Sequence, residues 1–367
     1  MTTESVTTVI CTHNRLALLR RAVASIEAVA GLDGVSVDIL VLANACSDGT
    51  VPWLMARSEA GKGMKGPALR FVEEPALGKA HALNRLRSLP TAELIAFVDD
   101  DHRVAQGYLG SLVAAARHYP DTGLFCGRIL PDWDGREPAW VHDRGPYRLY
   151  PLPVPRFDLG QKPRSIGADG PWPGGGNLAV RRDVLQRVGS FHTGFGPVGH
   201  NLAGAEDLEW VRRALAQGER LRYVPEMVQY HYVDPDRFRL GYLMKKAFER
   251  SASMVRLNDQ LLSNGPMPPL YMWAKVVDRV LKLFIFGRDA ARRRFYAMRL
   301  AGALGELKGY RLRRRDGRFP NAGRPMPTAD FKKPFRLALV SANDDDPSID
   351  TQGSLKVSKT TVDEPFL

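Results

Sequence analysis

Three consecutive carboxylates, Asp99, Asp100 and Asp101, stand directly after the apolar segment 94–98. Adjacent negative charges repel one another, so the triplet needs a cation or strong hydrogen-bond donors close by. Mg²⁺ or Mn²⁺ would meet that need, because these ions take oxygen ligands and are often held by one or two carboxylates together with substrate phosphates. The alternative is a solvated acidic turn, or a cap for a helix that begins near residue 105, and the triplet alone leaves both interpretations open.

Other polar and glycine-rich segments also follow predicted strands, where open α/β sheets bind their ligands. Short polar side chains can hydrogen-bond a base and a ribose there, and glycine lets the backbone approach phosphates closely. These segments are 11–15, 44–50, 73–79 with Asn84, 174–177, and the acidic pair Glu206-Asp207. Together with the carboxylate triplet, they predict a nucleotide-binding pocket at one edge of a sheet.

The elements that must position these segments alternate along the chain. β-branched apolar runs predict strands at 6–11, 37–42, 69–72, 94–98, 123–130, 177–180 and 228–232. Apolar residues at helical spacing predict helices between the early strands and later ones at 205–217, 238–257 and 271–307. This order indicates an α/β fold with a mostly parallel, doubly wound sheet.

The stretch 131–176 is rich in Pro, Gly and Trp and shows weak periodicity. An irregular stretch of that length inside a compact domain is more often a functional loop than filler. Trp172 lies near its end, and two interpretations of it stay open. The indole could stack on a sugar ring or a lipid, or it could belong to a small apolar cluster beneath the loop.

Positive charge is concentrated near the C-terminus. The formal net charge of the chain is +12, and fourteen Lys or Arg face four acids between residues 273 and 319. The same segment carries the apolar helical face Trp273, Val276, Val277, Val280, Leu281, Phe284 and Ile285. This composition is typical of a helix lying on an anionic membrane surface. The alternative is a helix packed on the catalytic domain, with Arg stems covering apolar surface. No nucleic-acid-binding motif accompanies the charge, so no nucleic-acid partner is expected.

The bulk numbers place the chain among globular proteins. It has 367 residues, of which 44% are hydrophobic and 25% charged. We expect no membrane-spanning segment and no signal peptide. Cys11, Cys46 and Cys126 lack the spacing of a metal site and are expected to be reduced thiols. These features predict a cytoplasmic protein, with any membrane contact being peripheral at the inner face. The predicted divisions are a catalytic domain at 1–235, a basic helical extension at 236–320 and a disordered tail at 321–367.

The motifs of these segments, taken in order, resemble the family-2 glycosyltransferases. They are Thr-x-Asn-Arg from Thr12, Asn-x-x-Ser-Asp-Gly-Thr from Asn44, Gly-Lys-Ala-x-Ala-x-Asn from Gly78, Asp-Asp-Asp from Asp99, Gly-Gly-Gly-Asn from Gly174 and Glu-Asp from Glu206. Each motif alone is weak, whereas their order and family-like spacing over roughly residues 6–250 are specific. The resemblance implies the GT-A fold and an inverting, metal-dependent transfer from a nucleotide sugar, expected to be a UDP-sugar, to a hydroxyl acceptor. Such an acceptor would belong to a polysaccharide, a glycolipid or a cell-envelope glycan.

The resemblance also implies roles for individual residues. The nucleotide and its sugar would be bound by Thr12, Asn14, Arg15, Asn44, Asp48, Gly78, Lys79, Asn84, Asp99 and Asp100. Mg²⁺ or Mn²⁺ would be held by Asp99, Asp101 and His231. The donor sugar or the acceptor would meet Gly175, Gly176, Asn177, Glu206 and Trp172. Asp207 would be the catalytic base. Without the resemblance, Lys79 could equally be a solvated helix start and His231 a packed strand histidine.

One position departs from the family pattern. An acid usually precedes the residue that matches Asn44 and contacts the base or ribose, but this chain has Ala43. We therefore expect either that this chain binds a different nucleotide, or that Asn44 or Asp48 makes the contact with the base or ribose instead. His102 follows the acidic triplet directly and is expected to lie at the surface.

The acids of the pair Glu206-Asp207 favour base chemistry on physical grounds as well. Two adjacent carboxylates push at least one pKa upward, and a raised pKa makes a better proton acceptor. The alternative is a pair of helix N-terminal acids favoured by the helix dipole. In the company of the other motifs, we favour Asp207 as the base. Two further functions stay open: a metal-dependent nucleotidyltransferase, and a non-catalytic basic protein that binds membrane or nucleic acid.

Overall fold

The structure is a computed structural model that describes residues 4–31, 34–61, 66–149, 153–196, 205–257 and 267–316. The predicted tail at 321–367 lies outside these residues, so its predicted disorder stays a prediction. The predicted extension at 236–320 is described except for 258–266 and its last four residues.

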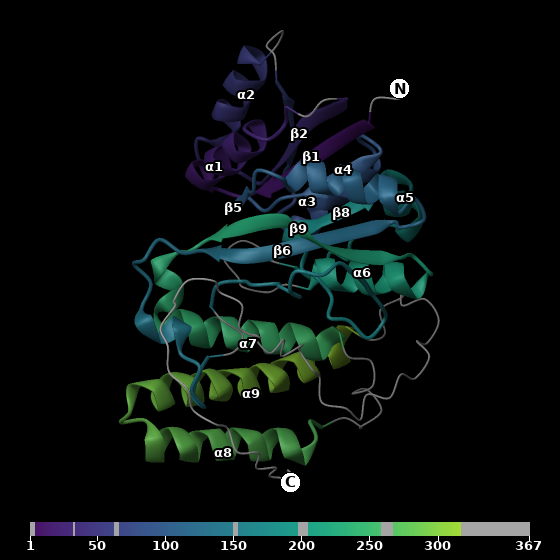
Figure 1. The fold of residues 1–367 in the computed structure, drawn as a ribbon. Coiled ribbons are helices and arrows are strands. Elements are labelled where there is room, and N and C mark those ends of the chain that lie inside the picture. The colour runs from purple at the N-terminus through teal and green to yellow at the C-terminus, as the bar shows by residue number, and fades with distance from the viewer. Residues whose placement is uncertain are drawn as a thin grey trace, which may run out of the picture.

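Within the described residues, nine strands form one sheet, and helices cover both of its faces (Figure 1). The strands are β1 (Glu4–Thr12), β2 (Val35–Asn44), β3 (Ala68–Glu74), β4 (Leu94–Phe97), β5 (His102–Val104), β6 (Leu124–Asp132), β7 (Arg164–Ile166), β8 (Leu178–Arg181) and β9 (Leu221–Tyr232). The helices around the sheet are α1 (Leu16–Glu27), α2 (Thr50–Ala60), α3 (Lys79–Asn84), α4 (Tyr108–His118), α5 (Arg182–Val188) and α6 (Glu206–Ala216). Short 3-10 turns accompany them: η1 (Arg85–Arg87), η2 (Ala139–His142) and η3 (Gly175–Asn177).

The strand order is β3-β2-β1-β4-β8-β6-β9-β5, and β7 pairs with β9 beside this path. β3, β2, β1 and β4 run parallel, as their alternation with helices predicts. β8 is antiparallel to both β4 and β6, and β6 is parallel to β9. The prediction of an α/β fold with a mostly parallel sheet is confirmed. The reversed strand β8 carries the Gly174–Asn177 motif back to the carboxyl end of β4, where the acidic triplet lies.

Apolar side chains fill both sides of the sheet. One cluster lies beneath α1 and α4 and contains Ile10, Leu19 and Ile26. The other lies beneath α3, α5 and α6 and contains the fully buried Trp210. Because β1 and β2 are covered on both faces, β-branched and apolar residues predominate in them without strand alternation.

β5 is an element that the sequence pattern did not predict. Its three residues follow the acidic triplet and pair with β9 in antiparallel register. A strand this short cannot show a period of two, which is the signal that sequence patterns offer. Its consequence is that His102, expected at the surface, is only 3% exposed.

Three helices follow the turn η4 (Pro235–Phe238): α7 (Leu240–Leu257), α8 (Leu270–Phe286) and α9 (Ala290–Asp316). Figure 1 shows them as layers beneath the sheet, with α7 nearest to it, α9 next and α8 outermost. The basic helical segment predicted at 271–307 is therefore divided into two helices. A Cβ atom on Gly287 would lie 2.3 Å from the carbonyl oxygen of Leu283, so only glycine fits where α8 ends.

None of the helices in the described ranges is both long enough and apolar enough to cross a bilayer.

Candidate active site

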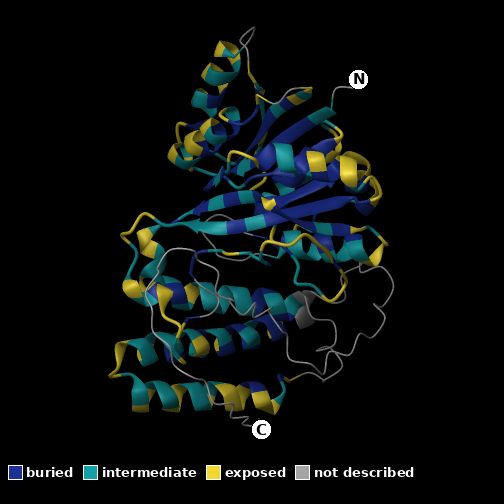
Figure 2. Ribbon diagram, viewed as in Figure 1, coloured by how far each residue is buried: buried dark blue, intermediate teal, exposed yellow. Residues whose placement is uncertain are grey.

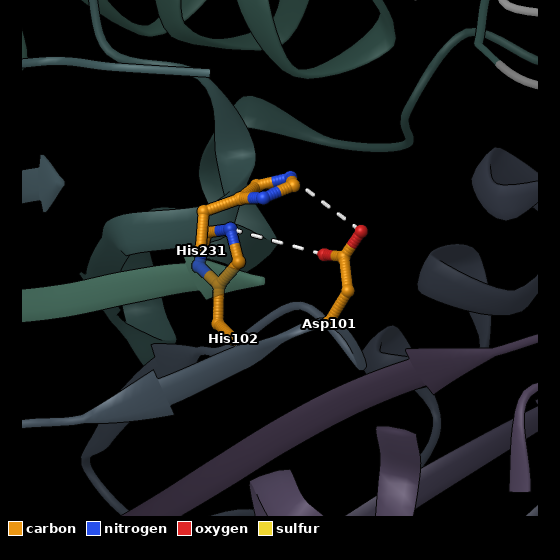
Figure 3. A group of neighbouring side chains, drawn as sticks. All are labelled: Asp101, His102 and His231. Atoms are coloured by element: carbon orange, nitrogen blue, oxygen red, sulfur yellow. Dashed lines mark ion pairs between the residues drawn. The ribbon is translucent and has the colours of Figure 1, made fainter. Parts of the chain in front are cut away.

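Two histidines and one carboxylate converge at the β5–β9 pair (Figure 3). His102 and His231 are direct register partners across the two strands, and Asp101 immediately precedes β5. The Nε2 atom of His231 lies 3.5 Å from the Asp101 carboxylate, and that of His102 lies 3.9 Å from it. All three side chains are buried, and one ligand atom from each lies within 4.8 Å of the others. This is a set of ligand types and separations that could hold a divalent cation.

The hydrogen bonds behind the two rings fix how they face the carboxylate. His231 Nδ1 lies 2.6 Å from the Tyr232 carbonyl oxygen, which can only accept. His102 Nδ1 lies 2.7 Å from Gln229 Oε1. The orientation of the Gln229 amide is set by Nε2, which donates to the Phe97 carbonyl oxygen at 3.0 Å. Both Nδ1 atoms therefore carry the proton, and both Nε2 atoms, within 4 Å of Asp101, are unprotonated, which is the arrangement found behind metal-ligating histidines.

The charges at this cluster also suit a cation. Burial is the largest influence on His231 and lowers its pKa to about 3, so the ring is neutral. Burial alone would raise the pKa of Asp101, but its cationic neighbours, Arg237 and Arg15 among them, hold that pKa well below its usual range. A neutral imidazole and an ionised carboxylate are the protonation states that a metal ion requires.

Arg237, in the turn η4, places a positive charge directly against this cluster. Its guanidinium donates to the Asp101 carboxylate at 3.0 Å and to His231 Nε2 at 3.1 Å. One planar cation thus bridges two of the three candidate ligands. The same lone pairs that would coordinate a metal ion accept from Arg237 in this structure.

The other two acids of the triplet have further partners, and one of them, Arg15, also donates to Asp101 at 3.2 Å. Asp100 accepts from Thr12 Oγ1 at 2.8 Å and from the Arg15 guanidinium at 3.1 Å. Burial, followed by repulsion from Asp101, raises the pKa of Asp100 to about 6. Asp99 accepts from Lys79 Nζ at 2.7 Å. The structure thus brings Thr12 and Arg15 to the triplet as expected, and it pairs Asp99 with Lys79 rather than with the histidines.

Lys79 and Asp99 lie beside the second acidic pair. Lys79 Nζ is 4.0 Å from the carboxylate of Glu206, which is 3% exposed. Burial, followed by the negative charge of Asp207, raises the pKa of Glu206 to about 8. Asp207 is the second residue of α6, directly after Glu206, and is only partly buried. Lys79, Asp99, Gly175 and Asp207 line one pocket together.

The glycine motif holds these groups in place by its backbone. The amide N–H of Gly175 donates to Asp207 Oδ2. A Cβ atom on Gly175 would lie 2.9 Å from the Asp207 Cβ, and one on Gly176 would lie 2.6 Å from Asp99 Oδ2 and 2.8 Å from the His102 ring. A side chain at either position would therefore displace these groups. One short turn contacts the candidate base, an acid of the triplet and a candidate metal ligand.

The segments predicted to bind the nucleotide lie along the ends of β1 and β2. Asn14 Oδ1 accepts from the backbone N–H groups of Ser47 and Asp48 at 2.7 and 3.2 Å, which ties the two loops together. Asn44 is 3% exposed and accepts from the Gly78 backbone N–H at 2.8 Å. Its own amide donates to two carbonyl oxygens of the loop that precedes α3. Because the polar atoms of Asn44 are engaged in these hydrogen bonds, its side chain supports the surrounding loops. Asp48, in contrast, is exposed.

Three other predicted residues have structural partners away from the acidic cluster. Asn84 exchanges two hydrogen bonds with the backbone of Phe191, at 2.7 and 2.9 Å. Asn177 is fully buried and donates to the carbonyl oxygens of Arg128 and Met227, both at 2.8 Å. The indole of Trp172 packs against the Arg212 guanidinium, 5.2 Å from the ring centroid, and contacts the apolar cluster of α6. Their proposed contacts with a sugar stay predictions.

Sequence reasoning missed two residues of the cluster. His102 offered one signal, because it directly follows three acids at a strand end and could have been counted as a ligand with them. Arg237 offered none, since it lies in a turn 136 residues beyond Asp101 and belongs to no motif. Only the fold brings that turn to the triplet.

Comparisons with known proteins agree with the fold. The sequence model of glycosyl transferase family 2 matches residues 7–189, which is about half of the chain. A glucosyl-dolichyl phosphate glucuronosyltransferase of Haloferax volcanii is 25% identical over 175 residues, covering 47% of this chain and 53% of its own length. The chain thus spans about half the length of this curated relative. A mannosyltransferase of Pyrobaculum calidifontis, solved with GDP-Man and Mn²⁺, has a similar fold with a TM-score of 0.52 at 19% identity, covering 83% of this chain and 86% of its own.

Proposed function

Because the chain belongs to glycosyl transferase family 2, we propose that it transfers a sugar from a nucleotide-sugar donor to a hydroxyl acceptor with inversion. The donor that we propose is a UDP-sugar, and the cofactor is Mg²⁺ or Mn²⁺. The intact acids of the triplet and of the pair at the start of α6 favour this function over a non-catalytic basic protein. The family match favours it over nucleotidyl transfer.

The observation that carries the proposal is that the candidate base, one acid of the triplet and a candidate metal ligand all lie against the glycine turn at 174–176. Its backbone contacts Asp207 on one side and Asp99 with His102 on the other. A base and a site for the departing diphosphate must flank the reacting carbon of a sugar donor. This turn sets the two groups at a fixed separation, which is what orientation of reactants requires.

The residues that would hold the metal ion are Asp101, His102 and His231. The bound ion would neutralise charge that develops on the leaving diphosphate. Asp99 and Lys79 would then face the donor sugar or its phosphates from the pocket that they line. Arg237 would need to leave the ligand atoms that it contacts here, and its cation would remain close enough to bind the same diphosphate.

The chemical step that we propose is a single displacement. The acceptor oxygen attacks the anomeric carbon, the bond from that carbon to the diphosphate oxygen breaks, and Asp207 takes the acceptor proton. The nucleoside diphosphate leaves with both electrons of the broken bond. Attack opposite the leaving group inverts the anomeric configuration.

The acceptor that we propose is lipid-linked or membrane-proximal. The name of the Haloferax relative refers to glucosyl-dolichyl phosphate, a sugar on a lipid phosphate, and this supports the choice. The basic helices of the C-terminal layers support it as well. Polysaccharide and soluble glycan acceptors are the alternatives that an assay must include.

The experiment is a release assay with a panel of UDP- and GDP-sugars, each with Mn²⁺, with Mg²⁺ and with excess chelator. We expect a nucleoside diphosphate to be released from a UDP-sugar, and release to stop in chelator. Release of pyrophosphate from a nucleoside triphosphate would identify a nucleotidyltransferase instead. Thermal stabilisation by UDP with Mn²⁺ tests donor binding separately, because a bound ligand stabilises only the folded state.

A further inference from the structure

The outermost helix, α8, carries most of the large exposed apolar side chains among the residues that the structure describes. Across the described residues, twelve large hydrophobic side chains are exposed, and nine of them lie between residues 267 and 285. Leu270 and Phe284 are the most exposed, at 86% and 88%. Figure 2 shows exposed positions along α8, whereas the strands of the sheet are coloured mostly as buried or intermediate. A contiguous exposed apolar surface of this kind marks an interaction site.

These side chains form one stripe. At 3.6 residues per turn, Leu270, Trp273, Val277, Leu281 and Phe284 lie on a single face of α8. Met272 lies on the opposite face and is 1% exposed, packed with residues of α7 and α9. In most surface helices the apolar face packs against the protein, but in α8 the larger apolar face points away from it. α8 buries a small apolar contact inward and presents its large apolar stripe, defined by these five residues, outward.

α9 carries much of the remaining basic sequence but has a different environment. A Cβ atom on Gly305 would lie 2.1 Å from the Phe248 carbonyl oxygen, and one on Gly309 would lie 2.4 Å from that of Ala252. Glycine thus lets α9 pack directly on the backbone of α7. The sequence of segment 273–319 fits either a helix on a membrane surface or a helix packed on the rest of the protein. The packed interpretation fits α9, and the exposed apolar stripe belongs to α8.

Basic residues are concentrated in the same part of the sequence as the stripe. Between residues 267 and 300, eight Lys or Arg face two acids. Lys275 and Lys282 lie on α8 itself, where they pair with Glu306 and Asp278. Arg288 and Arg293, at the turn into α9, are exposed. An apolar stripe with exposed positive charge near its C-terminal end is complementary to a surface whose interior is apolar and whose outside is anionic.

We propose that α8 lies in the interface of an anionic lipid bilayer, with its stripe buried among the acyl chains. Trp273 and Tyr271, at the N-terminal end of the helix, are residues favoured at the boundary between lipid and water. The charges at 275, 279 and 282 prevent α8 from spanning the bilayer and keep it parallel to the surface. α7 and α9 lie between the stripe and the sheet, so a surface-bound enzyme would hold its catalytic domain on the water side.

The test is co-sedimentation of the full chain with vesicles of phosphatidylglycerol and phosphatidylcholine, compared with phosphatidylcholine alone. We expect recovery with the anionic vesicles and a loss of recovery at high salt, because the Debye length is only about 8 Å even at physiological ionic strength. Phe284→Ser combined with Leu270→Ser should weaken binding at least tenfold, or about 1.4 kcal/mol. Equal binding by the variant, or no binding by the parent chain, overturns the proposal.

A matched control separates the stripe from exposed apolar surface in general. Met55, on α2, is 57% exposed and lies far along the chain from α8, so Met55→Ser should bind vesicles as the parent chain does. The emission of Trp273 should shift to the blue on vesicle binding, and Trp273→Phe should remove that shift. Thermal stabilisation by UDP with Mn²⁺ should be the same in all variants, which separates this proposal from that of glycosyl transfer.

A second copy of the chain is the other partner that an apolar stripe could accept. Light scattering of the parent chain and of the Leu270→Ser, Phe284→Ser variant decides this. A dimer that the variant converts to a monomer, without recovery on anionic vesicles, would overturn the membrane proposal.

Discussion

His102 and His231 stand opposite each other in the antiparallel β5–β9 pair, with their ring centroids 4.9 Å apart. Each ring donates its Nδ1 proton to a fixed oxygen and turns Nε2 toward Asp101. The backbone register therefore assembles this cluster before any ligand arrives. Preorganisation of this kind lowers the cost of filling the site, and displacement of Arg237 is a cost that remains.

The first prediction distinguishes the two acids that the sequence assigned to the metal. Asp101→Asn should weaken Mn²⁺ binding by roughly a hundredfold or more, since even residues outside the ligand shell are worth about 10- to 100-fold. Asp99→Asn should change it less than about tenfold, because Asp99 is paired with Lys79. Electron paramagnetic resonance of free Mn²⁺ measures both affinities. Equal losses would place Asp99 in the ligand shell.

The second prediction concerns Arg237, which contacts the lone pairs that a metal ion would use. Arg237→Gln should tighten the binding of Mn²⁺ alone by about tenfold, because hydrogen bonds to charged groups contribute about 1.5–3 kcal/mol and must be broken before coordination. Arg103→Gln is a suitable control, since Arg103 lies on β5 but pairs with Asp132. Weaker Mn²⁺ binding in the Arg237 variant would show that the guanidinium supports the site instead of competing for it.

The third prediction compares two adjacent glycines. In Gly175→Ala, the added Cβ would approach the Asp207 Cβ to 2.9 Å, whereas in Gly174→Ala it would stay 3.5 Å from Oδ2, an ordinary contact. We expect the Gly175 variant to lose about 10²-fold in kcat, because a base displaced by about 1 Å costs that much. The Gly174 variant should stay near the parent rate. Steady-state kinetics on both, with donor binding as the folding control, checks this difference.

The fourth prediction concerns the base itself. Asp207→Asn keeps the shape and the hydrogen bond from Gly175 but cannot take a proton, so transfer should fall by about 10²- to 10⁴-fold. Donor binding should persist. Glu209→Gln, in the same turn of α6 and paired with Arg213, is the control and should remain active. A fully active Asp207 variant would move the role of base to Glu206.

The fifth prediction is a dependence of stability on pH. The pKa of Glu206 is raised from 4.5 to about 8, so the folded chain holds this proton more tightly than the unfolded chain. Stability from this group is complete below pH 4.5 and is lost as the pH rises through 8, because the native state then must bury a charge. In Glu206→Gln, the free energy of unfolding should decline less over this range. Urea denaturation of both proteins across these pH values measures it, and parallel curves would contradict the assignment.

The sequence by itself determined the parts of this protein that depend on local pattern. Segments rich in β-branched and apolar residues predicted the buried parallel strands β1, β2 and β4, since strands covered on both faces need no alternation. The order of short motifs at the strand ends predicted the family, and the comparisons confirm it. The acids 99–101 were located at the edge of the sheet because the carboxyl ends of parallel strands meet there.

Only the tertiary structure decided which of these acids meets which partner. Register across the antiparallel β5–β9 pair places His102 beside His231, and register between strands distant in sequence leaves no trace in either segment alone. The approach of Arg237 to Asp101 likewise depends on where the turn after β9 ends. The basic segment at the C-terminus divides into a packed α9 and an exposed α8 because glycine lets only α9 approach the α7 backbone. Burial and charge pairing depend on such long-range contacts, whereas periodicity reports only on neighbours along the chain.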